Sequence, residues 1–204
     1  METFILDEAD RMLDMGFIDD MRSILGAMPK AKQGLFFSAT FSNEIKRLVN
    51  DFLNDPVTVS IKTRDTAASV MQDVIRATSD ADKLEALHEI LNKPEYSKVL
   101  IFREMKRHVD GLAEELTKRG FKALGLHGDM HNRERERAVK ALESGKVQVV
   151  IATDVAARGL DINDISLVIN YDIPNNYETY VHRIGRTGRG TKLRSEERRV
   201  GKEC

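Results

Sequence analysis

The sequence contains a single cysteine among its 204 residues, and that cysteine is Cys204. One cysteine excludes an internal disulfide framework and is typical of a reducing compartment, so we expect a cytoplasmic protein. No apolar run approaches the ~20 residues of a membrane-spanning helix, and the acidic first residues do not resemble a secretory signal. We therefore expect no membrane anchor.

The sequence also lacks an excess of either charge, with 32 Lys and Arg against 33 Asp and Glu. Any nucleic-acid binding must then come from local clusters of basic residues and not from the net charge. With 41% hydrophobic and 32% charged residues, the chain can bury a core and form one domain or two small ones. We expect it to act as a monomer.

The stretch Phe4–Asp10 reads F-I-L-D-E-A-D, an apolar run that ends in three carboxylates. This pattern favours a buried parallel strand that delivers acids to the carboxyl edge of a sheet, where ligands of α/β proteins bind. Asp7 would be placed to hold hydrated Mg²⁺ beside a nucleotide, and Glu8 to take a proton from an attacking water. Asp10 would be free to hydrogen-bond elsewhere. The alternative is a strand that enters an acidic first turn of a helix.

A second strand is predicted at Gly34–Phe37, after a turn at residues 15–17 and a helix that stops at Pro29. It ends in Ser38-Ala39-Thr40, and the hydroxyls of Ser38 and Thr40 can both donate and accept hydrogen bonds. They could link the acids to a mobile partner, or they could simply cap the strand.

A helix capped by Ser42 should run from about Asn43 to Asn54. The polar stretch from Val57 to Ser69 has no helical period, and we place a domain linker within it at residues 63–69. A surface loop inside one domain is the alternative.

Strand and helix patterns alternate beyond the linker, which predicts a doubly wound parallel sheet of the α/β class. An extended segment covers residues 70–78, and the capping pattern of Ser79 and Asp82 begins the next helix. The predicted strands are residues 98–102, 123–126, 147–152 and 167–170. The predicted helices between them end at Gly120 and Gly145.

Two groups of residues in this second unit carry candidate chemistry. Thr153 follows a strand and can give a hydroxyl and a backbone N–H to a phosphate, while Asp161 could accept from a ribose hydroxyl. An ordinary strand-to-helix turn with an Asp cap is the alternative. On the late helix, His182, Arg186 and Arg189 would form one stripe if helical geometry holds. Two such arginines can hold a transferring phosphoryl group. The alternative, which is the more common case for a basic helix face, is a solvated stripe with no ligand.

Four motifs occur together, in order and suitably spaced. They are D-E-A-D at 7–10, S-A-T at 38–40, T-D-V-A-A-R-G-L-D-I at 153–162 and H-R-I-G-R-T-G-R at 182–189. On these motifs, residues 2–190 resemble a DEAD-box ATP-dependent RNA helicase. The resemblance implies three-layer RecA-like domains of the P-loop NTPase class, with residues 1–62 as the end of the first domain and 70–190 as most of the second.

The resemblance also implies roles for individual residues. Asp7 would bind Mg²⁺ through water, and Glu8 would activate the hydrolytic water for ATP. The remaining assignments are Asp10 linked to Ser38, Thr40 and His182; Asp161 on the ribose; Arg186 and Arg189 on the γ-phosphate; and Arg135, Thr153, Gly128 and Asp129 on RNA phosphates. Contacts of this kind read the RNA backbone, so we expect weak sequence specificity and strong salt dependence.

The chain departs from the family pattern in three places. No G-x-x-x-x-G-K-[ST] phosphate loop occurs in the 204 residues, so we expect the chain to begin inside the first domain and to hydrolyse almost no ATP alone. Residues 191–204 carry eight charges and two isolated aliphatics, and we expect this tail to be foreign to the family and disordered. Arg103-Glu104-Met105 and Asn132 stand where the family has other residues, which weakens the RNA assignments there.

Two other functions are compatible with the sequence. An intact second unit could bind or anneal RNA without ATP, and salt-dependent RNA binding with no effect of nucleotide would favour that function. The chain could instead dock on a protein partner through an open sheet edge or the charged helix at residues 133–140, in which case it would have no affinity for RNA. A pure binding module does not need Asp7, Glu8 and Arg186 together.

Overall fold

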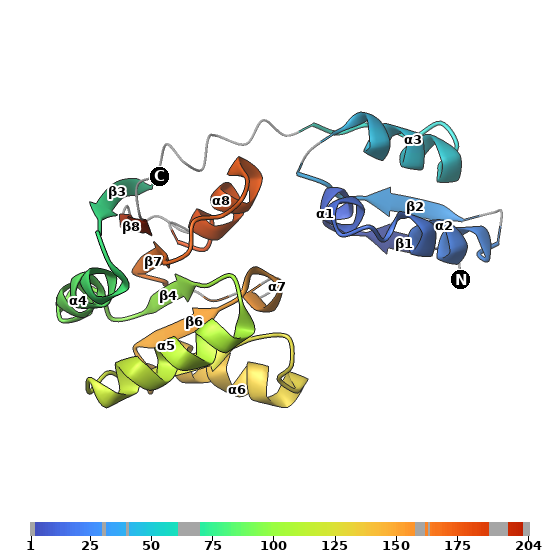
Figure 1. Ribbon diagram of the computed structural model, residues 1–204. Helices are drawn as coiled ribbons and strands as arrows, with labels where there is room; N and C mark the ends of the chain where they lie inside the picture. The colour runs from blue at the N-terminus through green and yellow to red at the C-terminus, as the bar shows by residue number, and fades with distance from the viewer. Residues whose placement is uncertain are drawn as a thin grey trace. The chain divides into compact units, whose positions relative to one another are not determined.

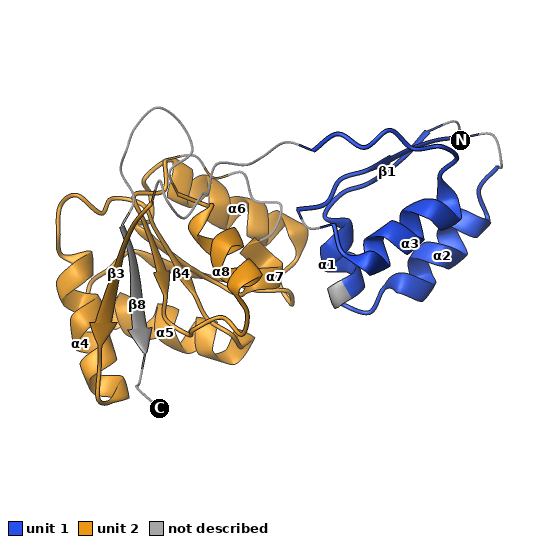
Figure 2. Ribbon diagram, turned by 90° about the horizontal axis from the view of Figure 1, so that it is seen from above, with its two compact units in different colours: residues 1–62 blue, residues 63–204 orange. Residues whose placement is uncertain are grey.

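The computed structural model describes all residues except 1, 2, 30, 31, 40, 61–69, 158–161, 163, 188–195 and 202–204. The chain divides into two compact units, Met1–Lys62 and Thr63–Cys204 (Figure 2). The predicted linker at 63–69 lies outside the described residues. Within the described part, no helix has the length and apolarity to span a bilayer.

Unit 1 contains two parallel strands and three helices. Strand β1 (Thr3–Leu6) pairs with β2 (Gln33–Phe36) in the register Thr3↔Gln33 to Leu6↔Phe36. The helices are α1 (Ala9–Asp14), α2 (Ile18–Gly26) and α3 (Asn43–Phe52). Both predicted strands are therefore present, and they are parallel neighbours.

The core of unit 1 is small and lies on one side of the strands, where the helices pack (Figure 2). Ala9, Ile45 and Val49 are buried together, whereas Ile5 on the other face of β1 is 61% exposed. The prediction of a buried strand therefore holds for only one face of β1. Side chains alternate across a strand, and in the described residues of this unit only one face of the sheet is covered.

The ends of the helices in unit 1 follow the predicted local chemistry. Ser42 Oγ accepts a hydrogen bond from Ile45 N at 3.2 Å, so the hydroxyl satisfies one of the free N–H groups at the start of α3. Gly16, in the turn between α1 and α2, has φ +81°, a conformation that side chains strongly disfavour.

Unit 2 is built on a six-stranded sheet in which every strand pair is parallel. The strand order is β3-β8-β7-β4-β6-β5. The strands are β3 (Met71–Arg76), β4 (Val99–Phe102), β5 (Ala123–Leu126), β6 (Val149–Ala152), β7 (Leu167–Asn170) and β8 (Glu196–Gly201). The helices are α4 (Asp80–Leu91), α5 (Lys106–Lys118), α6 (Asn132–Glu143), α7 (Asp154–Ala157) and α8 (Tyr177–Ile184) (Figure 1). The predicted parallel α/β sheet is confirmed.

The sheet of unit 2 carries a hydrophobic core on each face. Helices α4 and α5 pack on one face against side chains such as Val99 and Ile101, while α6 and α7 pack on the other against Leu100 and Phe102. The central strands β4, β6 and β7 are buried along their whole length, as strands covered on both faces must be. This rigid centre positions the loops that follow these strands.

The prediction of a disordered tail is wrong for residues 196–201, which form β8 between β3 and β7. Its backbone pairs in parallel with both neighbours, for example Glu196 with Met71 and with Leu167. A strand pairs with its neighbours through its backbone N–H and C=O groups. The segment E-E-R-R-V-G has these groups whatever its side chains are, so it can pair with β3 and β7. With β8 in place, the edge strand on this side of the sheet is β3.

Candidate functional site

The acids of unit 1 sit in a tight turn that follows β1. Glu8 has φ +51° and ψ +45°, the left-handed conformation that is uncommon for any residue but glycine. Its backbone N–H donates to Asp7 Oδ1 at 2.9 Å, and its carbonyl accepts from Arg11 N at 3.0 Å, which starts α1. The turn places the exposed carboxylate of Asp7 and the half-buried side chain of Glu8 at the carboxyl end of the strand.

The second strand brings Ser38 to the same edge. Leu6 pairs with Phe36, and the backbone is further joined by Phe37 N to Leu6 O at 2.7 Å and Ala9 N to Phe37 O at 3.1 Å. The segments that carry Asp10 and Ser38 therefore adjoin, as the parallel pairing predicted. Thr40, the other hydroxyl of this motif, lies outside the described residues.

The strained turn at Glu8 leads to a stability prediction. Glu8→Gly should stabilise unit 1 by about 1 kcal/mol relative to Glu8→Ala, because only glycine adopts φ +51° without strain. Urea-dependent hydrogen exchange of the α1 amides would measure the difference. Glu8→Gln keeps both the Cβ and the strain and should leave stability unchanged. Equal stability of the glycine and alanine variants would show that the turn stores no strain.

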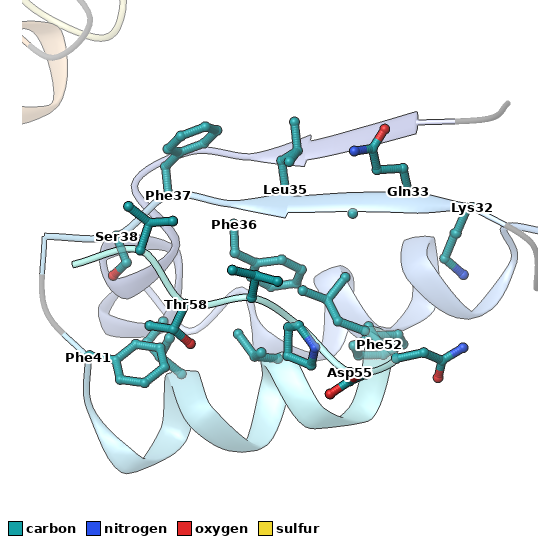
Figure 3. Close-up of a pocket in the computed structure, with 18 residues that line it drawn as sticks. Lys32, Gln33, Leu35, Phe36, Phe37, Ser38, Phe41, Phe52, Asp55 and Thr58 are labelled. Atoms are coloured by element: carbon teal, nitrogen blue, oxygen red, sulfur yellow. The ribbon is translucent and has the colours of Figure 1, made fainter. Parts of the chain in front are cut away.

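A cavity of about 620 Å³ lies beside β2 and was not foreseen from the sequence. Figure 3 shows it bounded by β2 on one side and by α3 and the segment after it on the other, with the Phe36 ring directed inward. Lys32 and Ser38 both line it, so the hollow reaches the edge that carries the acids. Sequence reasoning missed it because its lining residues come from β2, from α3 and from the chain after α3, which only the fold brings together.

In unit 2, four strand ends place polar residues at one edge of the sheet. Because β4, β5, β6 and β7 are parallel, their carboxyl ends meet there. The residues that follow these strands are Arg103, His127-Gly128-Asp129, Thr153 and Tyr171-Asp172. The Gly128-Asp129 turn and Thr153, both predicted to contact RNA, are thus on the same edge.

Arg135 is tied to the chain that follows Thr153. One guanidinium nitrogen donates to the Ala156 carbonyl oxygen at 3.2 Å, and its Nε is buried without a hydrogen-bond partner in the structure. Thr153 itself donates its backbone N–H to Leu126 O at 3.2 Å and is half-buried. A buried donor without a partner is costly, and the Arg135 guanidinium keeps hydrogen-bonding capacity beyond its bond to Ala156.

Asp129 has a different environment from Thr153. Its carboxylate is exposed and forms an ion pair with Lys106 at the start of α5. The hydrogen bond from Lys106 lowers the pKa of the Asp129 carboxyl, so it is charged at neutral pH. A negative charge near a phosphate is unfavourable. The hydrogen-bond donors that the Gly128-Asp129 turn can offer to a phosphate are therefore its backbone N–H groups.

Arg183, which sequence reasoning missed, forms four side-chain hydrogen bonds at this edge. It is 3% exposed, and its guanidinium forms a bidentate pair with Asp154 at 2.7 and 2.8 Å. It also donates to Asn170 Oδ1 at 2.8 Å and to the Asp172 carbonyl oxygen at 2.7 Å, and it lies over the Phe102 ring. Its spacing from the buried Tyr180 was the available signal, because residues three apart share a helix face.

Helix α8 ends sooner than the predicted stripe requires. The helix stops at Ile184, with Gly185 as its C-cap, and Arg186 lies in a turn in which its N–H bonds to Arg183 O at 3.2 Å. Thr187 then anchors the turn by donating to Ile165 O at 2.8 Å. His182 and Arg186 therefore do not form the predicted helical stripe, and Arg189 and Asp161 lie outside the described residues. The helix ends where Thr187 ties the following turn to Ile165, and Gly185 in that turn is a poor helix former.

Arg103, one of the departures noted in the sequence, has a structural role. It pairs with Asp172 Oδ2 at 2.9 Å and stacks over Tyr171 with 4.5 Å between the guanidinium carbon and the ring centre. The same Asp172 oxygen accepts the Glu104 N–H at 2.9 Å. Arg103 therefore joins the ends of β4 and β7.

Comparison with known proteins identifies the family. The DEAD/DEAH box helicase pattern matches residues 1–48, and the helicase conserved C-terminal domain matches residues 82–191, more than half of the chain. The chain belongs to the DEAD-box helicase family. The predicted RecA-like fold is also that of its structural neighbours.

The related helicases are longer than this chain. The DEAD-box ATP-dependent RNA helicase CshA of Bacillus subtilis is 43% identical over 192 residues, which are 94% of this chain and 39% of the relative. The RNA helicase CrhR of Synechocystis is 45% identical over 184 residues, 90% of this chain and 37% of the relative. The chain thus spans about two fifths of these DEAD-box relatives.

Solved structures of DEAD-box proteins also resemble this chain. Dbp5 of S. cerevisiae, bound to RNA and ADP BeF3, matches with a TM-score of 0.85 and 31% identity, over 100% of this chain and 54% of that one. A DEAD box protein from Methanococcus jannaschii matches with a TM-score of 0.62 and 39% identity, again over 100% and 54%.

Proposed function

We propose that this chain is part of an ATP-dependent RNA helicase that couples ATP binding and hydrolysis to local unwinding of RNA duplexes or remodelling of RNA–protein complexes. Residues 1–62 are the end of its first RecA-like domain and 70–190 most of the second. The observation that carries the proposal is the grouping of acids at one sheet edge in unit 1 and of hydroxyl and cationic groups at one sheet edge in unit 2.

The nucleotide chemistry is assigned to both units. Asp7 is an exposed carboxylate at a strand end, which fits Mg²⁺, because this ion keeps most of its waters and takes one or two carboxylates besides the phosphates. Among the described residues, no three candidate ligands gather to hold a metal by themselves. Bound Mg²⁺ would neutralise phosphate charge. Glu8 accepts a proton from the attacking water, and Arg186 with Arg189 stabilises the charge of the transferring phosphoryl group.

The other proposed contacts complete both sites. Asp161 accepts from the ribose, and Asp10, Ser38, Thr40 and His182 connect the acids of the first domain with the second. Thr153, Arg135 and the Gly128-Asp129 turn bind RNA phosphates, so affinity should depend little on base sequence. We further propose that the protein is cytoplasmic and monomeric.

The 204-residue chain by itself should hydrolyse almost no ATP. It contains no phosphate loop, so no backbone cradle and lysine hold the β- and γ-phosphates. Phosphate release stimulated by RNA and abolished by Glu8→Gln in the purified chain would contradict this statement. RNA binding, in contrast, rests on unit 2 and should be measurable in the chain as it is.

The experiment that tests RNA binding measures the affinity of the chain for single-stranded oligouridylate as salt is varied. Arg135→Gln should weaken binding for every RNA sequence and reduce the slope of log K against log salt by about 0.7, the value for one lost phosphate contact. The matched control is Arg137→Gln on the same helix, which should leave the slope unchanged. Equal slopes for the two variants would contradict the assignment of Arg135.

A further inference from the structure

Arg183 connects the two groups of residues to which the proposed function assigns RNA and nucleotide. On one side its guanidinium holds Asp154, the residue directly after Thr153. On the other side its own backbone lies in α8 between His182 and Ile184, and its carbonyl accepts the N–H of Arg186. A single side chain therefore spans from the RNA-side turn after β6 to the nucleotide-side end of α8.

We propose that Arg183 is a positioning residue that transmits RNA binding at Thr153 to His182 and Arg186 through its bidentate pair with Asp154. The inference rests on the proposed function of Thr153 and Arg186. Arg183 itself touches neither RNA nor nucleotide in this proposal, because its polar atoms bond to Asp154, Asn170 and Asp172 within the fold.

The geometry of the pair suits transmission. Helix α7 has four residues and is held by buried Ala156 and Ala157, while α8 has eight and is held by buried Tyr180, Arg183 and Ile184, so the Arg183–Asp154 pair joins two short helices directly. The side chain of Arg183 is 4% exposed and that of Asp154 is 26% exposed, which limits competition by water. Two parallel hydrogen bonds fix both distance and angle, so a shift of the turn at Thr153 must move α8 or break the pair.

The other contacts of Arg183 give the linkage a fixed support. Asn170 and Asp172 end and follow β7, and Phe102 ends β4, so the guanidinium is held against two central strands of the sheet. Of the contacts that Arg183 makes with described residues, only the Asp154 pair leads to the RNA-side turn. Removing the charge of Asp154 should therefore weaken transmission while the other contacts keep α8 folded.

Hydrogen exchange of the α8 amides, with and without single-stranded oligouridylate at saturation, tests the inference in the chain as it exists. In the parent chain RNA should slow exchange of residues 181–187 about fivefold or more, the lower end of usual allosteric coupling. In Asp154→Asn, RNA should still bind, but exchange of the same amides should not respond. Asp154→Glu keeps the charge and should recover part of the response.

The control is Glu85→Gln, which breaks another arginine–carboxylate pair, at 2.8 Å between Glu85 in α4 and Arg119 at the C-cap of α5. It should leave the response of α8 to RNA intact. If Arg183 has a purely structural role, the α8 amides of Asp154→Asn should exchange faster both without and with RNA. The ratio of the exchange rate without RNA to that with RNA would then equal the ratio in the parent chain, and this result would overturn the inference. If the parent chain binds no RNA, the proposed function fails and the inference with it.

Discussion

Replacing Arg186 by alanine is expected to lower RNA-stimulated ATP hydrolysis by about 10³- to 10⁵-fold in a protein that has a phosphate loop. This is the usual loss when an arginine that stabilises the transferring phosphoryl group is removed. The test protein is called the joined protein. It consists of the Bacillus subtilis relative up to the residue at which its similarity to this chain begins, followed by this chain. Steady-state phosphate release with and without RNA is the measurement.

The reason for the large effect is the position of Arg186. It lies in the turn after α8, held by its N–H bond to Arg183 O and by the anchor of Thr187 on Ile165. A fixed backbone at this position limits the reorganisation that the turn needs when the side chain meets developing charge. The matched control is Lys118→Ala, which removes an exposed cation paired with Glu114 and should leave the rate within about threefold. A similar small effect for Arg186→Ala would exclude it from the reaction.

The second large effect is on stability. Arg183→Met should lower the free energy of unfolding of unit 2 by about 3–5 kcal/mol, because it leaves the Asp154 carboxylate without its partner inside the fold. The urea dependence of hydrogen exchange in β4 and β6 would measure the loss, since these buried strands exchange only when the unit unfolds.

Two further variants separate the causes of that loss. Arg119→Met removes a more exposed arginine that pairs with Glu85 and Glu115, and it should cost less than about 1 kcal/mol. The double variant Arg183→Met with Asp154→Leu should be more stable than Arg183→Met alone, because an apolar pair leaves no buried charge. If Arg183→Met costs no more than Arg119→Met, the buried pair contributes little to the fold.

Much of the fold could be predicted from local sequence patterns. Strands β5 and β7 begin and end at the predicted residues, because both are apolar runs with clear breaks at each end. The cap of Ser42 on α3 and the terminating glycines Gly120 and Gly145, with φ of +91° and +71°, follow from chemistry within a few residues. Two strands separated by a predicted helix were found as parallel neighbours, although the structure places two helices, α1 and α2, between them.

What could not be predicted depends on contacts between distant segments. Arg183 resembled one more charge of a basic helix, and only the fold brings Asp154, 29 positions earlier, to its guanidinium. Strand β8 depends on a vacant place in the sheet, which no property of E-E-R-R-V-G indicates. Helix α8 ends at Ile184, before Gly185 and the Thr187 hydrogen bond to Ile165. The spacing of the motif residues did not indicate this end.

The central claim is that the acids of unit 1 and the arginines of unit 2 act on one nucleotide, which requires the two units to close. The most direct measurement is the distance between fluorophores on Asn50→Cys in α3 and Glu114→Cys in α5, in the joined protein with every other cysteine removed. The account predicts that this distance changes to a single short value only when RNA and a non-hydrolysable ATP analogue are both present. A distance that is the same with both ligands and with neither would contradict it.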